Sequence, residues 1–271
     1  RAFVAFAGPL DPLTGFCPPL LTQLSSAREM TGDIMAMRST ILVLAALLAS
    51  AGAGLHAQEM VGKYRLVPAL PRPGATPILD NDRGRVWDVI YPPGMSTGMH
   101  RHPSDFVGVE LVETMLKVTT PDGVEHVNPV HRGQIYMLPK GLTHIEENVI
   151  GQPQRNSILI ELKDGGTHAY DNHSPAPAGF AALGQKQAAD NPRVTLWDAH
   201  WAAGATGKAF FQTHDMFLVP MDAGTLSITS PDDAAKTLPL SGGMVVFLQG
   251  GHVRTIQSTA GNVRAAVVEL K

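Results

Sequence analysis

Short apolar runs broken by glycine and proline dominate the chain from Gln58 onward. The runs are rich in Val, Ile, Tyr and Trp, which favour strands, and turn-forming clusters such as Pro92-Pro93-Gly94 separate them. A turn or two of helix is expected only near Phe180–Ala189. Many short strands at even spacing predict an all-β barrel or sandwich. The strands predicted in the first half are Arg85–Tyr91, Val107–Leu111, Met115–Thr119, Gln134–Leu138 and Ser157–Leu162.

The chain repeats itself at an offset of 110 residues, which shrinks to 108 near the end. The matches are concentrated in turn residues, so they indicate a shared backbone path. We therefore predict two copies of one β unit, at 58–163 (core 83–163) and 193–271, joined by a linker at 164–192. Matched pairs include Trp87 with Trp197, Asp105 with Asp215, Pro121 with Pro231, Gly133 with Gly243, Gly141 with Gly251 and Leu162 with Leu270.

The first 57 residues have a different character. Arg38 precedes the apolar run Ile41–Ala49, and no acidic residue lies between Met35 and Gln58. This is typical of a secretory signal peptide, predicted at 35–57 with cleavage after Ala57 or within Ala51-Gly52-Ala53, and it indicates a periplasmic or secreted protein. The alternative is a membrane anchor, but the run is shorter than the roughly 20 residues that a spanning helix needs. Residues 1–34 begin with Arg and are interpreted as an upstream, non-native extension without a structural role.

Charge and cysteine content narrow the classes of partner. The formal net charge is -3 and no cluster of Lys and Arg occurs, which argues against nucleic-acid binding. The one cysteine, Cys17, lies in the leader, so disulfides and thiolate metal sites are not expected. We expect a small-molecule ligand or substrate and no stable membrane anchor. The oligomeric state is left open, with a homodimer as one arrangement.

Two histidine motifs stand out in the first copy. His100 and His102 are two residues apart, so on a strand they project from the same face. Gly133, Pro139 and Gly141 frame a strand and a tight turn that can bring His144 to the same place. Three imidazoles suit Zn, Fe, Cu or Ni better than Mg or Ca. With three protein ligands, coordination positions stay open, as in a reactive site.

These motifs resemble those of the cupin family. The segment Gly133–Asn148 matches every fixed position of the second cupin motif, and Gly94–His102 matches the first motif except at its glutamate. The resemblance implies two cupin-type jelly-roll β-barrels (double-stranded β-helices) in tandem, a bicupin. It also implies one divalent first-row metal ion in the mouth of the first barrel, held by His100, His102 and His144. Iron is the expected metal, with Zn, Ni, Cu and Mn as alternatives.

The missing glutamate shapes the predicted site. The cupin pattern places it five residues after the second histidine, where this chain has Val107. The alternation of Val107, Val109 and Leu111 predicts that these side chains face the barrel interior and that Glu110 faces outward. Asp105 shares the parity of Val107 and is the candidate for a fourth ligand or for a contact with the ligands. Its counterpart Asp215 is present in the second copy, where the histidines are absent. This favours a role for Asp105 in forming a turn.

The second copy lacks the ligands. Phe210, Gln212 and Arg254 stand where the first copy has its histidines. We interpret this lobe as degenerate and structural, with no metal motif. The alternative is an anion contact made by Arg254, because arginine pairs well with carboxylates.

Two functions follow from the resemblance. One is a three-histidine mononuclear iron dioxygenase acting on a small chelating organic substrate. The other is a non-catalytic cupin that binds or senses a small molecule or metal. No general acid or base can be named, because the sequence does not decide whether Glu146 or Glu147 points inward. Cupins host many chemistries, so the fold alone does not choose.

Overall fold

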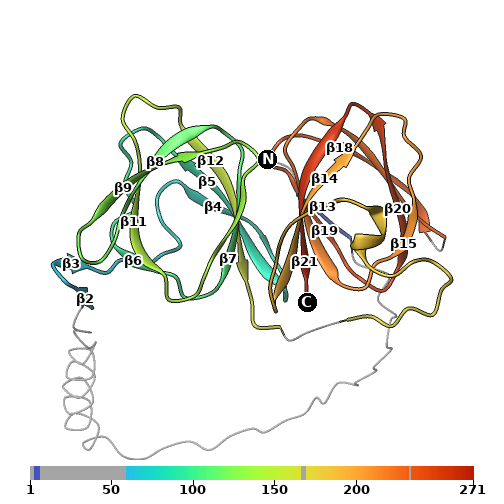
Figure 1. Ribbon diagram of the computed structural model, residues 1–271, viewed down its shortest axis with the longest axis horizontal. Helices are drawn as coiled ribbons and strands as arrows, with labels where there is room; N and C mark the ends of the chain where they lie inside the picture. Colours follow the sequence, from blue (N-terminus) through green and yellow to red (C-terminus); the bar gives the residue numbers. More distant parts are fainter. Residues whose placement is uncertain (1–2, 7–58, 166–168, 232) are drawn as a thin grey trace, which may run out of the picture. The chain divides into compact units, whose positions relative to one another are not determined.

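The computed structural model describes residues 3–6, 59–165, 169–231 and 233–271 (Figure 1). In these residues the chain is built of strands, with one 3₁₀ turn, η1 (Phe180–Leu183). The predicted all-β class and the two tandem jelly-roll barrels are confirmed. The predicted signal peptide at 35–57 lies outside the described residues. Among the described residues no helix is both long and apolar enough to cross a membrane.

Two sheets build the first lobe and curve around its interior (Figure 1). One has the strand order β10-β7-β12-β5-β4, and the other has the order β6-β11-β8-β9. A short hairpin of β2 (Met60–Val61) and β3 (Tyr64–Arg65) precedes them. The strands are β4 (Ala75–Asp80), β5 (Gly84–Tyr91), β6 (His100–Arg101), β7 (Phe106–Glu110), β8 (Thr114–Thr119), β9 (Glu125–Val130), β10 (Ile135–Leu138), β11 (Thr143–Asn148) and β12 (Arg155–Leu162).

The second lobe repeats this plan. Its sheets have the orders β1-β19-β16-β21-β14-β13 and β15-β20-β17-β18. The repeated turn glycines adopt the same left-handed backbone conformation: φ is 85° at Gly133 and 76° at Gly243. The repeat in the sequence is therefore a repeat of the backbone. The strands are β13 (Lys186–Asp190), β14 (Val194–Trp201), β15 (Ala209–Phe211), β16 (Asp215–Pro220), β17 (Gly224–Ser230), β18 (Asp233–Leu240), β19 (Val245–Leu248), β20 (Val253–Ala260) and β21 (Val263–Leu270).

Two predictions about the flanking segments need correction. The second half of the predicted linker belongs to the second lobe, because β13 pairs with β14 and Phe180 of η1 is fully buried in that lobe's core. The extension at 1–34 was expected to have no structural role, but Phe3–Phe6 form β1, which pairs in parallel with β19. Without β1, strand β19 would be the edge of its sheet and would present unpaired backbone N–H and C=O groups. A short apolar segment can pair with such an edge as an additional strand.

Three apolar clusters organise the described residues. One fills the second barrel, and includes Phe180, Trp197, Phe210 and Leu226. A second is shared by the lobes and packs residues such as Val107, Val109 and Ile158 against Phe217 and Val268. The third lies inside the first barrel and consists of Trp87, Val89, Tyr91, Phe106 and Leu159. It covers only part of that interior, which leaves room for polar side chains.

Candidate metal centre

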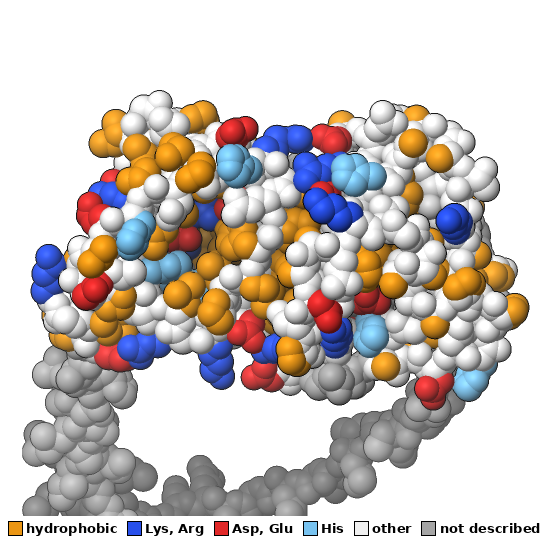
Figure 2. Space-filling view, in the orientation of Figure 1, with side chains coloured by type: hydrophobic (Ala, Val, Ile, Leu, Met, Phe, Trp, Pro, Cys, Tyr) orange, Lys and Arg blue, Asp and Glu red, His pale blue; other side chains and the backbone are white. Residues whose placement is uncertain are grey.

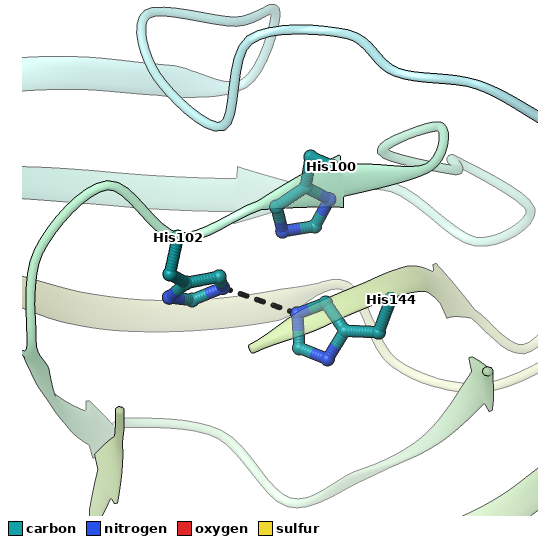
Figure 3. Close-up of side chains that lie close together, drawn as sticks. All are labelled: His100, His102 and His144. Atoms are coloured by element: carbon teal, nitrogen blue, oxygen red, sulfur yellow. Dashed lines mark hydrogen bonds between the residues drawn. The ribbon is translucent and has the colours of Figure 1, made fainter. Parts of the chain in front are cut away.

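The three predicted histidines converge in the first barrel (Figure 3). His100 on β6 lies opposite His144 on β11 in the antiparallel register, and His102 follows β6 directly. One ligand nitrogen from each residue lies within 4.8 Å of the others, and the Nε2 atoms of His102 and His144 are 3.2 Å apart. All three side chains are buried. His144 lies 42 residues after His102 in the sequence, so the pairing of β6 with β11 assembles the site.

The turn before His144 is held in place by the backbone and by Asp105. The Gly141 N–H donates to the His102 carbonyl at 2.9 Å, and the Lys140 N–H donates to Asp105 Oδ1 at 2.7 Å. Asp105 Oδ2 also pairs with Arg193 Nη1 at 2.9 Å. Asp105 is not among the residues whose ligand atoms converge. The structure therefore gives it the turn-forming role that its repeat suggested.

The imidazoles are in the protonation state that a metal needs. Burial, reinforced by the Arg72 guanidinium, lowers the pKa of His100 to about 4. Burial, with His100 next to it, lowers the pKa of His102 to about 4, and burial also lowers the pKa of His144. All three are thus neutral near pH 7, which is the form that binds a cation.

The hydrogen bonds of the histidines also fit a metal. His100 Nδ1 lies 3.0 Å from the Gly98 carbonyl, which can only accept, so Nδ1 carries the proton and Nε2 the lone pair. His102 Nδ1 is buried and has no hydrogen-bond partner among the described residues. Three neutral nitrogen donors with no carboxylate suit a divalent first-row metal. The donor set therefore fits a metal ion and leaves coordination positions for other ligands.

A comparison with protein-family models finds no match. The β-alanine degradation protein BauB of Pseudomonas aeruginosa is 36% identical over 94 residues, which are 34% of this chain and 95% of the relative. A relative this similar over nearly its whole length shows the family to which the chain belongs. The chain belongs to the cupin superfamily.

Two solved structures are also similar to this chain. A cupin domain from Bordetella pertussis Tohama I is 35% identical, with a TM-score of 0.31, and the match covers 35% of this cupin and 99% of that chain. AerE from Microcystis aeruginosa is 12% identical, with a TM-score of 0.52, and the match covers 73% of this cupin and 98% of that chain. The second likeness concerns the fold alone.

The position that faces the histidines on β7 is occupied by Phe106. Its ring contacts the ring of His102, with centroids 5.0 Å apart. Val107 was predicted to face the interior, but it is fully buried in the cluster shared by the lobes. Glu110 was predicted to face outward, but it is 1% exposed and lines the barrel interior. The register of this strand was wrong by one residue because both of its faces are buried.

Sequence reasoning also missed a buried charge cluster beside the histidines. Arg155, 1% exposed, donates through Nη2 to Glu110 Oε1 at 2.6 Å and through Nη1 to Glu146 Oε2 at 3.1 Å. Tyr136 donates to Glu110 at 2.7 Å. Its ring lies over Gly108, where a Cβ would come within 2.2 Å of it. Of the two glutamates left undecided, Glu146 points inward, while Glu147 pairs with Lys117.

These charges keep Glu146 ionised. Burial alone would raise the pKa of Glu146, but the Arg155 guanidinium, with smaller contributions from His144 and Arg72, lowers it well below its usual range. Burial raises the pKa of Tyr91 to about 12. Neither group can exchange a proton readily near neutral pH.

A cavity of about 170 Å³ adjoins the cluster. His144, Glu146, Arg155 and Tyr136 line its polar side, and apolar residues such as Leu116 line the rest. In Figure 2 the face toward the viewer is hollowed over the first lobe, and histidine side chains border the hollow. Because one water takes up about 30 Å³ of liquid, this space suits a molecule of a few heavy atoms.

The second lobe has no counterpart of this site among its described residues. Phe210 and Arg254 are paired in the register that His100 and His144 occupy in the first lobe. Arg254 Nε donates to Gln212 Oε1 at 2.6 Å, and Nη2 donates to the Gln249 carbonyl at 3.0 Å. An anion contact by Arg254 stays a prediction. The interior positions that match Glu146 and Arg155 hold Ile256 and Val263, so this barrel is filled with apolar side chains.

Proposed function

We propose that the first lobe is a mononuclear metal-dependent dioxygenase, with iron bound by His100, His102 and His144, acting on a small chelating organic molecule. The proposal rests on the convergence of three buried, neutral imidazoles with Phe106, rather than a carboxylate, beside them. A redox-active metal in this site would supply Lewis acidity and electrons for oxygen-dependent chemistry. The adjoining cavity would take the substrate.

The protein's own residues would orient and shield the reaction. The apolar cluster around Phe106 and Trp87 keeps water away from one side of the histidines. Glu146 and Arg155 hold each other in fixed positions, so they would present a rigid polar wall to the substrate rather than transfer protons. Such preorganised charges need no rearrangement when the charge distribution of the substrate changes.

The second candidate is a non-catalytic binding or sensing cupin. One observation favours it: the ionisable groups near the histidines are locked in ion pairs or have pKa values far from neutral. On this proposal the metal would only anchor a ligand. Oxygen consumption separates the two candidates.

The test begins with anaerobic reconstitution of the full chain with Fe(II), followed by metal analysis. Oxygen uptake is then measured with small acids, diketones and β-alanine. The last compound is included because the relative BauB is named a β-alanine degradation protein. A dioxygenase should consume oxygen with at least one compound, and the His102→Ala variant should not. Metal binding without oxygen uptake would favour the binding cupin. Absence of metal from the reconstituted chain would reject the dioxygenase and any ligand site anchored by a metal, and would leave only a cupin that binds a small molecule directly.

We also propose that the protein is exported, on the basis of Arg38 and the apolar run Ile41–Ala49. The expected mature N-terminus is Gln58 or a residue near it. N-terminal sequencing of protein recovered from a periplasmic fraction tests this. Recovery of unprocessed protein from the cytoplasm would count against export.

A further inference from the structure

Arg72 reaches the histidines from the segment that precedes the first barrel. It stands between Pro71 and Pro73, and a residue before proline is restricted to extended conformations. Its side chain is only 8% exposed. Nη1 lies 3.2 Å from His100 Nε2, the nitrogen that carries the lone pair. The guanidinium thus borders the ligand atoms of the proposed metal.

Tyr91 fixes the orientation of this guanidinium. Arg72 Nε donates to the Tyr91 hydroxyl at 2.5 Å, and the guanidinium carbon lies 5.3 Å from the centroid of the Tyr91 ring. The Nη atoms are thereby turned toward His100 and Glu146. Nη2 is 3.7 Å from Glu146 Oε2, which is an ion pair but too long for a hydrogen bond.

The carboxylates of the interior are bound more closely by the other arginine. Arg155 lies 2.6 Å from Glu110 and 3.1 Å from Glu146. In this cluster two glutamates balance two arginines, so its net charge is zero before any metal binds. A divalent cation held by neutral imidazoles would leave a buried excess of positive charge. Uncompensated buried charge is strongly unfavourable, and an anionic ligand would remove it.

We infer that the first-lobe site selects a small carboxylate ligand and that Arg72 is the residue that binds the carboxylate beside the metal. This inference rests on the proposed metal site and names its class of ligand. A metal bound at His100 Nε2 would take the lone pair that Nη1 now faces and leave Nη1 without this acceptor. The planar guanidinium could then donate two parallel hydrogen bonds to a carboxylate, which an ammonium group cannot do. Arg72 is thereby assigned to ligand specificity.

Calorimetric titration of the zinc-loaded full chain tests the inference without any dependence on turnover. Malonate is the probe, and malonamide, which has a similar shape but no charge, is its control. We expect malonate to bind, malonamide to bind far more weakly, and Arg72→Gln to weaken malonate binding roughly 10–100-fold, as for the loss of charged hydrogen bonds. The malonate affinity of Arg72→Lys should fall between those of the parent and Arg72→Gln, because lysine keeps the positive charge but lacks the paired N–H donors of the guanidinium.

Arg101→Gln is the matched control. Arg101 lies between two of the histidines in the sequence, but its side chain is exposed and contacts Thr143. This variant should bind malonate as the parent does. Equal malonate affinity in the parent and Arg72→Gln, with zinc bound by both, would overturn the inference and leave the metal site intact.

Failure of the metal site gives a different result. If the parent chain binds no zinc, the proposed function fails. The titration of the metal-free chain then decides the role of Arg72: malonate binding that Arg72→Gln weakens supports it, and binding that the variant leaves unchanged, or no binding, rejects it. If Arg72→Gln does not fold, the comparison of Arg72→Lys with the parent decides in the same way.

Discussion

The ring of Phe106 lies edge-on against the ring of His102, with centroids 5.0 Å apart and an interplanar angle of 79°. This contact fixes which residue of β7 could supply a further metal ligand. Phe106 faces the histidines, while its neighbour Val107 faces away from them, into the cluster shared by the lobes. Substitution by glutamate is therefore expected to have opposite effects on metal binding at these two positions.

Phe106→Glu should place a carboxylate next to the histidines. The metal-free variant should be less stable than the parent, because a buried aromatic ring is lost, typically at about 3–5 kcal/mol. Metal should restore much of this loss, since a ligand that binds only the folded state stabilises it. The measurement is thermal melting with and without Zn²⁺, and the variant's gain on adding metal should exceed the parent's.

Val107→Glu is the companion variant. It would bury a carboxylate among apolar side chains of both lobes, where no cation pairs with it, and we expect destabilisation on the order of 3–5 kcal/mol that metal does not relieve. Melting of this variant at the parent's temperature in saturating metal would show that the register of β7 is not as described.

Metal binding should depend on the three histidines and reach one ion per chain. Alanine at His100, His102 or His144 removes a ligand, so the loss of affinity should exceed the roughly 10–100-fold typical of residues that only orient ligands. Asp105→Asn should fall within that milder range, because Asp105 contacts a turn and Arg193. Elemental analysis and competitive metal titration measure both effects.

The exposed histidines His126 and His131 provide controls, and alanine at either should leave metal affinity unchanged. Two metals per chain would contradict the assignment of the second lobe. A loss for Asp105→Asn as large as that for His102→Ala would make Asp105 a ligand.

Arg155 should be important for stability as well as for the site. Arg155→Met would leave Glu110 and Glu146 buried without their closest cation, at a cost of about 3–5 kcal/mol. The control is Lys117→Met, which breaks a partly exposed pair with Glu147 and should cost less than about 1 kcal/mol. Urea unfolding compares the two, and similar costs would mean that the buried cluster contributes little.

Acid should destabilise the metal-free protein through the histidines. Burial lowers the pKa of His100 and His102 to about 4 in the folded chain, against about 6.5 in an unfolded one. The unfolded chain then binds more protons, so the free energy of unfolding falls as the pH drops below about 6.5, by roughly 1 kcal/mol per pH unit for each histidine. Glu146 acts in the same direction at lower pH, because its pKa is also depressed and its contribution is lost on protonation.

Urea unfolding of the metal-free chain between about pH 7 and pH 5 measures this slope. His100→Gln removes one of the groups, so its stability should depend less steeply on pH. Identical slopes for the parent and His100→Gln would show that His100 does not resist protonation in the folded state.

Much of the architecture was predictable because it depends on local patterns. The five strands predicted in the first half are present within two residues at each end, and the turn glycines repeat in register. The convergence of the three histidines was predictable because the residues that form the turn before His144 are close together in the sequence. The choice of face on β7 was not predictable, because alternation separates the two faces of a strand but does not identify the interior when both are buried.

The polar residues around the histidines were beyond local patterns. Arg155 meets Glu110 from a strand 45 residues away, and Arg72 reaches His100 across 28 residues. Each residue alone would be taken for an ordinary surface arginine, because arginine is mostly exposed. Only the closure of the barrel brings these charges together.

The apolar cluster shared by the lobes bears on how the duplicated chain could diverge. Val107 and Ile158 of one copy pack against Phe217 and Val268 of the other, so deletion of either copy would expose the remaining sheet to water. On the proposed function, the second copy would serve through its outer surface, as a covalently linked partner of the first lobe. Its interior would then carry no part of the proposed chemistry, which agrees with the apolar Ile256 and Val263 at the positions of Glu146 and Arg155.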